Sequence, residues 1–387
     1  MRPRVAGSIF AKAHCAWGRD CDRNFLLKTR TMIDASTAAS SQALEPVLND
    51  EAELEARLAR PGEALVADLA RTDGDLLILG VGGKMGPSLA MLARNALDAA
   101  GQPRRRVIGV ARFSEAAVQE RLQRAGVETI AADLLAPGAL ERLPDAPHVI
   151  YMAARKFGST GDEPLTWAMN TYLPGRVAER YAASRIVAFS SGNVYPLTAV
   201  SAGGSVESDP VGPVGEYAQS VLGRERLFQH FSALHKTPGV LLRLNYATEL
   251  RYGVLVDVAR KVLAGTPVNL TMGHVNVIWQ GDANAVALRA LHDCKAPTQP
   301  LNLTGPELIS VRRLALDFAE ALGVPQPTFE GTEAPTALLN NATRCMERYG
   351  APQVSLRQMI AWVAHWVQHG GKTLAKPTKF EVRDGRF

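Results

Sequence analysis

The sequence has little cysteine, no long apolar run and, over most of its length, no excess of one charge. Its four cysteines, at positions 15, 21, 294 and 345, show no Cys-x-x-Cys spacing, so neither a metal site nor a disulfide framework is predicted. No apolar stretch approaches the ~18 residues that a membrane-spanning helix needs. The first residues lack the continuous apolar core of a secretory signal. We therefore expect a cytoplasmic protein without a membrane partner.

The positive charge of the chain is confined to its N-terminal segment. The formal net charge is +5, and residues 1–31 hold seven Lys and Arg against two Asp, which is the same surplus of five. The rest of the chain is therefore formally neutral and has no cationic stripe of the kind that binds nucleic acid. We expect residues 1–44 to be a basic, flexible N-terminal extension, and we expect no nucleic-acid partner.

From about residue 50 the sequence alternates between apolar strands and helical segments. Two helices are predicted first, and then strands and helices follow one another. The predicted strands are 75–80, 106–111, 127–132, 148–154 and 185–191, and the helices are 50–60, 62–71, 85–100, 114–126 and 164–183. Near-continuous Val, Ile and Leu strands separated by helices are typical of a parallel sheet that is covered on both faces. We predict a Rossmann-type, doubly wound α/β fold, which binds ligands at the carboxyl ends of its strands.

The residues after the first strand, Gly-Val-Gly-Gly-Lys-Met-Gly, have the composition of a phosphate-binding turn. Gly80, Gly83 and Gly86 are spaced G-x-x-G-x-x-G and lead directly into a helix. Glycines there permit a tight turn, let the backbone approach a pyrophosphate and let the helix pack on the strand. The helix N-terminus then offers N–H groups to the anion. We predict a dinucleotide site that includes Lys84 and Met85; the alternative is a merely tight turn.

The end of the second strand bears on the choice of cofactor. Sites that prefer NAD place Asp or Glu there to bind the ribose 2′-hydroxyl. This sequence has Arg112 and Ser114 and no acid. Because Arg112 and Lys84 together offer two cations to a 2′-phosphate, NADP is favoured over NAD. The alternative for Arg112 is a solvated loop position.

Four further segments occur in a specific order. Ser-Ser-Gly-Asn-Val-Tyr-Pro occupies 190–196, and Tyr217 follows Ser191 by 26 residues at the start of a helix. Ala-Ala-Asp-Leu occupies 131–134, and Met-Asn-Thr-Tyr-Leu-Pro-Gly occupies 169–175. Together with the glycine loop, this set resembles the extended short-chain dehydrogenase/reductase family, the NAD(P)-dependent epimerases and dehydratases. The resemblance runs from about Leu76 to Trp366.

The resemblance implies an oxidoreductase that moves hydride between a sugar carbon and nicotinamide. By position, it implies that Tyr217 is the general acid/base and that Ser191 binds the reacting oxygen. It implies that Asn170 orders the long helix and a proton-relay water, and that Asp133 and Leu134 contact the adenine. It further implies a sugar or nucleotide-sugar substrate and a homodimer formed by the two long helices after the fourth and fifth strands.

One residue departs from the family pattern, because Val221 stands where Tyr-x-x-x-Lys has its lysine. In the family that lysine holds the nicotinamide ribose and lowers the tyrosine pKa. An unperturbed tyrosine, with a pKa near ~10, is a poor base at neutral pH. Arg224 is on the same face of the helix as Tyr217 but two turns, ~10 Å, away.

A second lysine is a better candidate for the missing charge. Residues 149–156 resemble an epimerase segment whose lysine lies along the cofactor, and this places Ala153 and Lys156 at the cofactor. Our hypothesis is that Lys156 supplies part of the positive field near Tyr217. The alternative is a contact with a cofactor phosphate that leaves Tyr217 unaffected.

Two functions remain open, and so do the details of the substrate site. The first is an epimerase, dehydratase or reductase with an atypical active site; the second is a non-catalytic NAD(P)-binding sensor. Tyr195, Arg243, Asn245 and Arg251 are candidates for substrate binding, and structural anchoring is the alternative for each.

The predicted domains follow from these assignments. We expect a cofactor domain at 45–245, with the two leading helices, and a substrate domain at 246–387 whose segment near 275–293 packs back on the cofactor domain. Short strands at 274–280 and 301–305 and helices at 310–322 and 355–369 are predicted within the substrate domain.

Overall fold

The computed structural model describes residues 43–156, 158–376 and 378–386. The chain divides after Pro46, and Val47–Phe387 forms one compact unit. The basic extension predicted at 1–44 lies, except for its last two residues, outside the described residues. The domain limits predicted near residue 245 stay a prediction.

A seven-stranded parallel sheet runs through the compact unit in the order β12-β7-β5-β4-β1-β2-β3. Its strands are β1 (Leu76–Leu79), β2 (Val107–Ala111), β3 (Glu128–Ala131), β4 (His148–Tyr151), β5 (Arg185–Ser191), β7 (Gly239–Leu244) and β12 (Gln299–Leu303). The chain starts in mid-sheet at β1, moves outward to β3 and returns to β4 on the other side of β1. The strand order therefore reverses between β1 and β4, which is where doubly wound sheets bind ligands. The predicted fold is confirmed.

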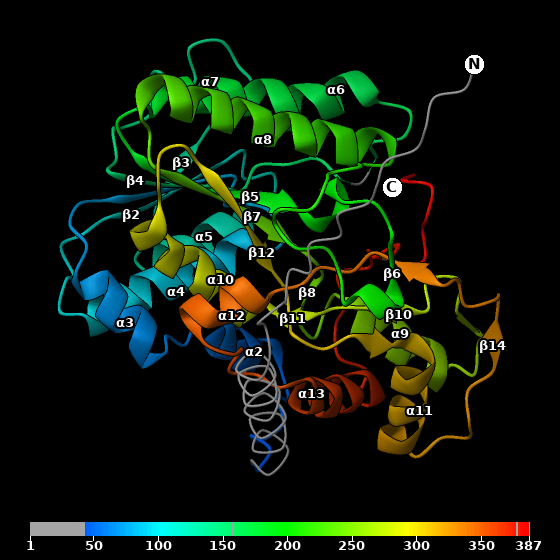
Figure 1. The fold of residues 1–387 in the computed structure, drawn as a ribbon. Helices are drawn as coiled ribbons and strands as arrows, with labels where there is room; N and C mark the ends of the chain where they lie inside the picture. Colours follow the sequence, from blue (N-terminus) through cyan, green and yellow to red (C-terminus); the bar gives the residue numbers. More distant parts are fainter. Residues whose placement is uncertain (1–42, 157, 377, 387) are drawn as a thin grey trace, which may run out of the picture. The chain divides into compact units, whose positions relative to one another are not determined.

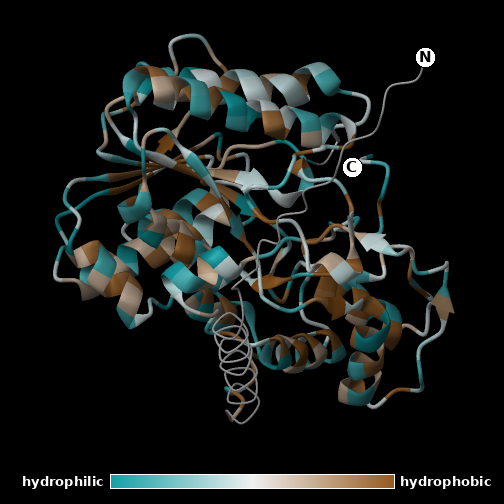
Figure 2. Ribbon diagram, viewed as in Figure 1, coloured by the Kyte–Doolittle hydropathy of each residue, from teal (hydrophilic) through white to brown (hydrophobic). Residues whose placement is uncertain are grey.

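Helices bury both faces of this sheet, as Figure 1 shows. One layer contains α6 (Glu163–Trp167), a π-helix (Ala168–Tyr172), α7 (Leu173–Arg180) and α8 (Gly215–His235). The other contains α3 (Glu63–Ala70), α4 (Gly86–Ala99), α5 (Ala116–Arg124) and α10 (Gln280–Arg289). Along β1, Leu77 and Leu79 pack toward the first layer, and Leu76 and Ile78 toward the second. Successive residues of a strand point to opposite faces, so a fully apolar strand satisfies both layers, and Figure 2 shows hydrophobic strands between them.

The strand predicted at 301–305 belongs to a different sheet from the one expected. Sequence analysis placed it in the smaller substrate domain, whereas β12 pairs in parallel with β7, from Gln299 opposite Val240 to Leu303 opposite Leu244. A short apolar run fits either environment, so its own residues do not identify the strand beside it.

The C-terminal half forms a second apolar core. It contains α9 (Val254–Leu263), α11 (Val311–Leu322) and α13 (Leu356–Gln368), and the ring centroids of Trp279 and Trp362 lie 5.2 Å apart. The leading helix α2 (Glu51–Leu58) contributes its buried leucines to this core. The remaining elements are β6 (Thr198–Ala199), β8 (Ala247–Thr248), β9 (Val268–Asn269), β10 (His274–Val275), β11 (Ile278–Trp279), β13 (Ile309–Ser310), β14 (Phe329–Glu330), β15 (Thr336–Ala337), α12 (Thr343–Tyr349) and the 3-10 helices Gly192–Val194, Val200–Ala202 and Ala290–Asp293.

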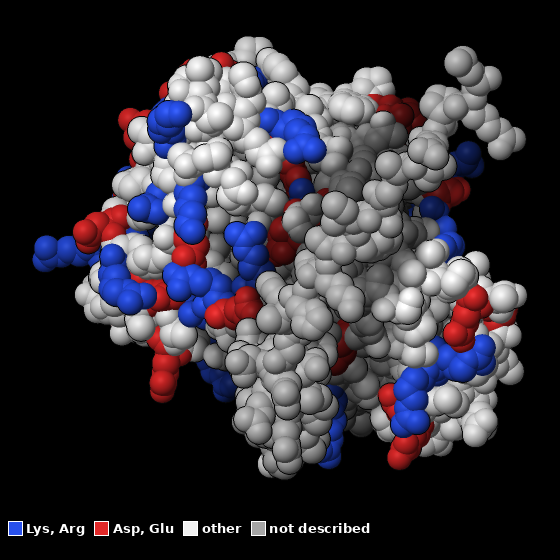
Figure 3. Space-filling model, viewed as in Figure 1, with Lys and Arg blue, Asp and Glu red and all other residues white. Residues whose placement is uncertain are grey.

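Charged side chains of both signs lie on the face of the molecule drawn in Figure 3. The basic and acidic side chains of the described residues are interspersed there. Within the part of the chain that the structure describes, no helix is both long and apolar enough to cross a bilayer.

Candidate active site

The glycine loop after β1 contains two glycines that have no room for a side chain and one that is exposed. Gly80 has φ +92°, and a Cβ there would lie 2.5 Å from the backbone nitrogen of Ala153. A Cβ on Gly86 would lie 2.1 Å from the carbonyl oxygen of Val81. Gly83 is exposed, and the nearest atom to its Cβ position is the Gly80 carbonyl oxygen at 3.5 Å. The fold itself therefore requires glycine at 80 and 86, but not at 83.

This difference yields a matched pair of substitutions. Gly83→Ala is expected to change the free energy of unfolding by less than about 0.5 kcal/mol and to weaken dinucleotide binding at least about tenfold, because the methyl group occupies the approach of a phosphate. Gly86→Ala is expected to lower the free energy of unfolding by about 2–3 kcal/mol through overpacking. Urea unfolding and calorimetric titration with NAD and NADP measure both. Unchanged NAD and NADP affinity in Gly83→Ala would leave the loop as a tight turn.

Lys84 extends in a direction that the sequence did not indicate. Its Nζ donates to the carbonyl oxygen of Ala247 at 2.8 Å and lies 4.1 Å from the ring centroid of Tyr252. Ala247 follows β7, whereas Arg112 follows β2, and these strands lie on opposite sides of β1. The predicted pairing of Lys84 with Arg112 around a 2′-phosphate is therefore corrected: Arg112 is exposed at the end of β2 without Lys84 beside it.

The other predicted cofactor residues follow the carboxyl ends of neighbouring parallel strands. Ala153 lies after β4 against Gly80. Asp133 lies after β3, and its carboxylate accepts a hydrogen bond from the backbone of Leu135 at 3.0 Å. Leu134 is buried in the core between the sheet and α7. These positions share one edge of the sheet with the glycine loop, as parallel strands require; their contact with a cofactor stays a prediction.

Ser191 and Tyr217 come together as the sequence motif predicts. Ser191 is the last residue of β5, Tyr217 lies in the first turn of α8, and their side chains share a hydrogen bond. Ser191 Oγ also donates to Asn193 Oδ1 at 2.9 Å. Burial raises the pKa of Tyr217, and this effect is opposed by the nearby Arg224 guanidinium and by the Ser191 hydrogen bond. A phenol and an alcohol thus form a pair that can hold and exchange a proton.

The surroundings of this pair contain one apolar and one cationic contact of note. Val221, one turn after Tyr217, is fully buried in a cluster with Tyr217, Val194 and Tyr195. Lys156 lies after β4 with its Nζ 5.8 Å from the centroid of the Tyr217 ring. Burial, and to a lesser extent Lys379, lower the pKa of Lys156 to about 8.

Asn170 is a residue of the π-helix, and several groups from other elements bind its side chain. Its side chain bonds the backbone N–H and C=O of Arg155, both at 2.8 Å, and donates to Ser220 Oγ at 3.0 Å. Arg224 donates to Asn170 Oδ1 at 3.0 Å and to the carbonyl oxygen of Phe189 at 2.7 Å. A π-helical turn often marks a functional position, because it redirects one side chain out of the regular ladder.

Arg224 is a residue whose importance sequence reasoning missed. Its seven-residue distance from Tyr217 suggested separation by two helical turns. The long side chain, only 2% exposed, nevertheless brings its charge close enough to lower the pKa of Tyr217. The signal available in the sequence was an arginine on the same helical face as the tyrosine.

Two of the predicted substrate residues lie in a buried polar network. Arg243 forms an ion pair with Glu225 at 2.8 Å, and the side chains are 4% and 0% exposed. Arg243 also donates to the Tyr195 hydroxyl at 2.6 Å, and Ser190 donates to Glu225 at 2.5 Å. Arg243 and Tyr195 thus have the contacts of structural residues, and the pair of Arg243 with Glu225 joins β7 to α8.

Asn245 and Arg251 are also engaged by the protein. Asn245 donates to the carbonyl oxygen of Leu338 at 3.3 Å. Arg251 forms ion pairs with Glu249 at 3.1 Å and with Glu55 of α2 at 2.7 Å. Direct contact of either residue with a substrate stays a prediction.

Two segments that are distant in the sequence also reach this region, and the sequence analysis did not predict either of them there. In the C-terminal tail, Phe380 is buried and Val382 packs against the cluster around Tyr217 and Val221. From the C-terminal half, the buried Asn340 side-chain amide lies against Gly192, where a Cβ would meet its Oδ1 at 2.7 Å. Neither polar atom of the Asn340 side chain has a hydrogen-bond partner among the described residues.

The doubly wound sheet, with a glycine loop after β1 and a Ser–Tyr pair after β5, defines a Rossmann-type α/β protein. A family model described as "NAD dependent epimerase/dehydratase family" matches residues 76–273, which is just over half of the chain. The chain belongs to this family, and the family-level resemblance is thereby confirmed. No curated protein matches it.

Solved structures share the fold at low sequence identity. A UDP-glucuronic acid 4-epimerase from Bacillus cereus, in complex with NAD, is 18% identical with a TM-score of 0.64, covering 77% of this chain and 100% of its own. A UDP-glucose 4-epimerase from Thermus thermophilus, in complex with NAD, is 20% identical with a TM-score of 0.63, covering 77% and 99%. The Thermotoga maritima UDP-glucose 4-epimerase with UDP-glucose is 17% identical with a TM-score of 0.61, covering 76% and 99%.

Proposed function

We propose that the protein is an NAD(P)-dependent oxidoreductase of the epimerase/dehydratase type, acting on a sugar or nucleotide sugar by transient hydride transfer. The observation that carries this proposal is the hydrogen-bonded Ser191–Tyr217 pair at the edge of the sheet where the glycine loop also lies. Family membership and the nucleotide sugars named for the structures of similar fold support the substrate class.

The glycine loop fits a dinucleotide, because space is open beside Gly83 that a side chain would fill. When bound, the nicotinamide supplies the hydride acceptor. We propose NAD as this cofactor. The preference for NADP is not supported, since Lys84 points toward Ala247 and the Bacillus and Thermus structures hold NAD. NADP is the second choice of cofactor, and Arg112 is the cation that remains to bind its 2′-phosphate.

In this proposal Tyr217 takes up and returns the proton of the substrate hydroxyl, and Ser191 holds the oxygen. Burial disfavours the phenolate that a general base needs. The Arg224 guanidinium, which is fixed to Asn170 and Phe189, opposes that effect, and Lys156 Nζ lies 5.8 Å from the centroid of the Tyr217 ring. We propose that they jointly replace the family's lysine, for which Val221 provides no charge.

The proposal predicts NAD-dependent turnover of a nucleotide sugar, with a rate that rises with pH as Tyr217 ionises. Lys156→Met is expected to move this rise to higher pH, because removal of a positive charge near the phenol raises its pKa. The rate of formation of the product nucleotide sugar, separated by chromatography and followed from pH 6 to 10, measures the profile. The matched control is Lys261→Met, because Lys261, a residue of the helix α9, forms its own ion pair with Glu381.

Two outcomes would contradict parts of this proposal. An unchanged pH profile in Lys156→Met would remove Lys156 from the acid/base machinery. Tight NAD binding without turnover of any nucleotide sugar would favour the non-catalytic sensor.

A homodimer through α6, α7 and α8 is part of the proposal; it is supported by the exposed Leu165, Trp167 and Tyr172 in this layer.

A further inference from the structure

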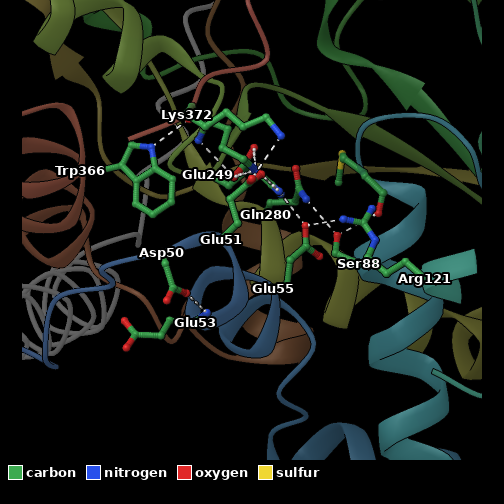
Figure 4. A network of polar contacts seen from close by, with 12 residues as sticks. Asp50, Glu51, Glu53, Glu55, Ser88, Arg121, Glu249, Gln280, Trp366 and Lys372 are labelled. Atoms are coloured by element: carbon green, nitrogen blue, oxygen red, sulfur yellow. Dashed lines mark hydrogen bonds and ion pairs between the residues drawn. The ribbon is translucent and has the colours of Figure 1, made fainter. Parts of the chain in front are cut away.

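The last residues of the chain leave α13 and run toward the start of α8, as Figure 1 shows. The described part of this C-terminal tail comprises residues 372–376 and 378–386. Its first residue, Lys372, contacts two helices, as Figure 4 shows: its Nζ pairs with Glu51 of α2 at 3.1 Å, and its carbonyl oxygen accepts a hydrogen bond from Trp366 of α13 at 3.0 Å. The tail is therefore fixed at its beginning, before it reaches the candidate active site.

Further contacts hold the middle of the tail on the C-terminal half of the protein. Thr378 donates its backbone N–H and its hydroxyl to Asp257 of α9, at 2.9 and 2.6 Å. Phe380 is buried in the second apolar core. Arg383 donates to the carbonyl oxygen and to the hydroxyl of Thr336, both at 2.7 Å. Chain ends are poorly ordered unless such contacts tie them down, so these contacts give the tail one defined course.

The end of the tail meets the start of α8 backbone against backbone. Gly215, the first residue of α8, has φ +82°, and a Cβ there would lie 2.5 Å from the carbonyl oxygen of Gly385. A Cβ on Gly385, where φ is +74°, would lie 2.2 Å from the carbonyl oxygen of Val214. Both positions therefore require glycine, because a side chain on either would push the tail away from the helix.

The side chain of Val382 reaches the candidate acid/base from the same segment. It packs against the apolar cluster formed by Val194, Tyr195, Tyr217 and Val221. Val221 is the position at which the family pattern has a lysine. An apolar residue of the tail thus covers a cluster in which the helix has also exchanged a charged residue for an apolar one.

The first turn of α8 depends on such contacts more than an ordinary helix start does. Its N-cap residue is Val214, whose side chain cannot accept a hydrogen bond. The first four N–H groups of a helix have no partner within the helix, and a Ser, Thr, Asp or Asn side chain at the N-cap normally binds one of them. Tyr217 lies in this turn, where its hydroxyl shares a hydrogen bond with Ser191.

We propose that the C-terminal tail is a positioning element of the active site, which holds the first turn of α8 so that the Tyr217 hydroxyl stays beside Ser191. Val382 and Gly385 are its positioning residues, because they contact this helix start and its cluster. The inference rests on the proposed function, in which Tyr217 is the acid/base. Its effect on the rate can be large, since a displacement of about 1 Å in an active site can cost about 100-fold.

Hydrogen–deuterium exchange, measured by mass spectrometry, tests the contact without any ligand. Gly385→Ala adds a methyl group that clashes with Val214 and moves the end of the tail off α8. We expect the backbone amides of residues 219–222, which bond to the carbonyl groups of the first helical turn, to exchange at least about tenfold faster. Gly370→Ala is the matched control. Its φ of +69° strains alanine in the same way, but no described atom lies within 4 Å of its Cβ position.

Kinetics test whether the tail acts through Tyr217. With UDP-glucose as substrate, we expect Gly385→Ala to lower kcat at least about tenfold while the dissociation constant of NAD stays within about twofold. Gly385→Ala combined with Tyr217→Phe is expected to be no slower than Tyr217→Phe alone, because the hydroxyl that the tail positions is already absent. A tail with only a structural role would lower kcat by the same factor in both backgrounds.

Val382→Ala is a second, milder variant that keeps the test decisive if Gly385→Ala does not fold. It removes two methyl groups from the cluster around Tyr217. We expect changes of the same kind, about threefold in the exchange of residues 219–222 and in kcat. Val324→Ala is its control, because Val324 is a partly buried valine that packs on the second core instead, and it is expected to change neither quantity.

Two results would overturn the inference. Exchange of residues 219–222 that stays unchanged in both tail variants would show that the tail does not hold the start of α8. An equal fall of kcat with and without the Tyr217 hydroxyl would assign the tail a general structural role. Wild-type protein that binds NAD without turnover of any nucleotide sugar would instead remove the proposed function, and the exchange measurement, which needs no ligand, would still decide whether the tail holds α8.

Discussion

Replacing Tyr217 by phenylalanine is expected to lower kcat for NAD-dependent turnover by about 10²–10⁴-fold, the usual contribution of a general acid/base. The substitution removes the hydroxyl that pairs with Ser191 and leaves the ring in its cluster with Val194 and Val221. NAD affinity and the free energy of unfolding are therefore expected to change little. Steady-state kinetics, NAD titration and urea unfolding measure the three quantities.

Tyr181→Phe is the matched control for the loss of a buried tyrosine hydroxyl. Its hydroxyl donates to the carbonyl oxygen of Pro144 at 3.3 Å. Tyr181 lies in the core between the sheet and α7, away from the carboxyl ends of the strands that carry the candidate site. Its removal is expected to cost about 1 kcal/mol of stability with kcat unchanged. Equal kinetic effects of the two substitutions, or full activity in Tyr217→Phe, would contradict the role of Tyr217.

Arg243→Met is expected to lower the free energy of unfolding by about 3–5 kcal/mol, because it leaves the buried Glu225 carboxylate without its cation. Glu225 also accepts the hydrogen bond of Ser190, the residue before Ser191, so the pair supports the strand end that carries the candidate site. Denaturant unfolding of the wild type and the variant measures this loss.

The control for Arg243→Met is Arg348→Met, which breaks an ion pair with Asp293 whose arginine side chain is 61% exposed. Exposed pairs contribute only about 0–1 kcal/mol. If Arg243 instead serves as a substrate residue, Arg243→Met keeps its stability and loses substrate affinity. That result would contradict the anchoring role assigned here.

The centre of the sheet could be predicted from the sequence because its strands β1, β2 and β4 are buried on both faces. The segment Leu76–Leu79 is such a strand, and the glycine loop after it could only lie at the carboxyl end. The Ser191–Tyr217 pair was implied by the resemblance to the extended short-chain dehydrogenase/reductase family, whose motifs occur here in the same order.

What could not be predicted depends on partners far along the chain. The residues of β12 fit either sheet, and only the three-dimensional fold pairs them with β7. The direction of Lys84 is set by the position of Ala247, 163 residues later. The reach of Arg224 depends on the π-helix that presents Asn170, and five residues in that conformation leave no clear signal in the sequence.

A crystal structure of the protein soaked with NAD tests the central claim most directly. We predict the pyrophosphate against the backbone around Gly83 and the nicotinamide ring beside the hydroxyl groups of Ser191 and Tyr217. An empty glycine loop at saturating NAD, or a nicotinamide bound far from these two hydroxyls, would contradict the account.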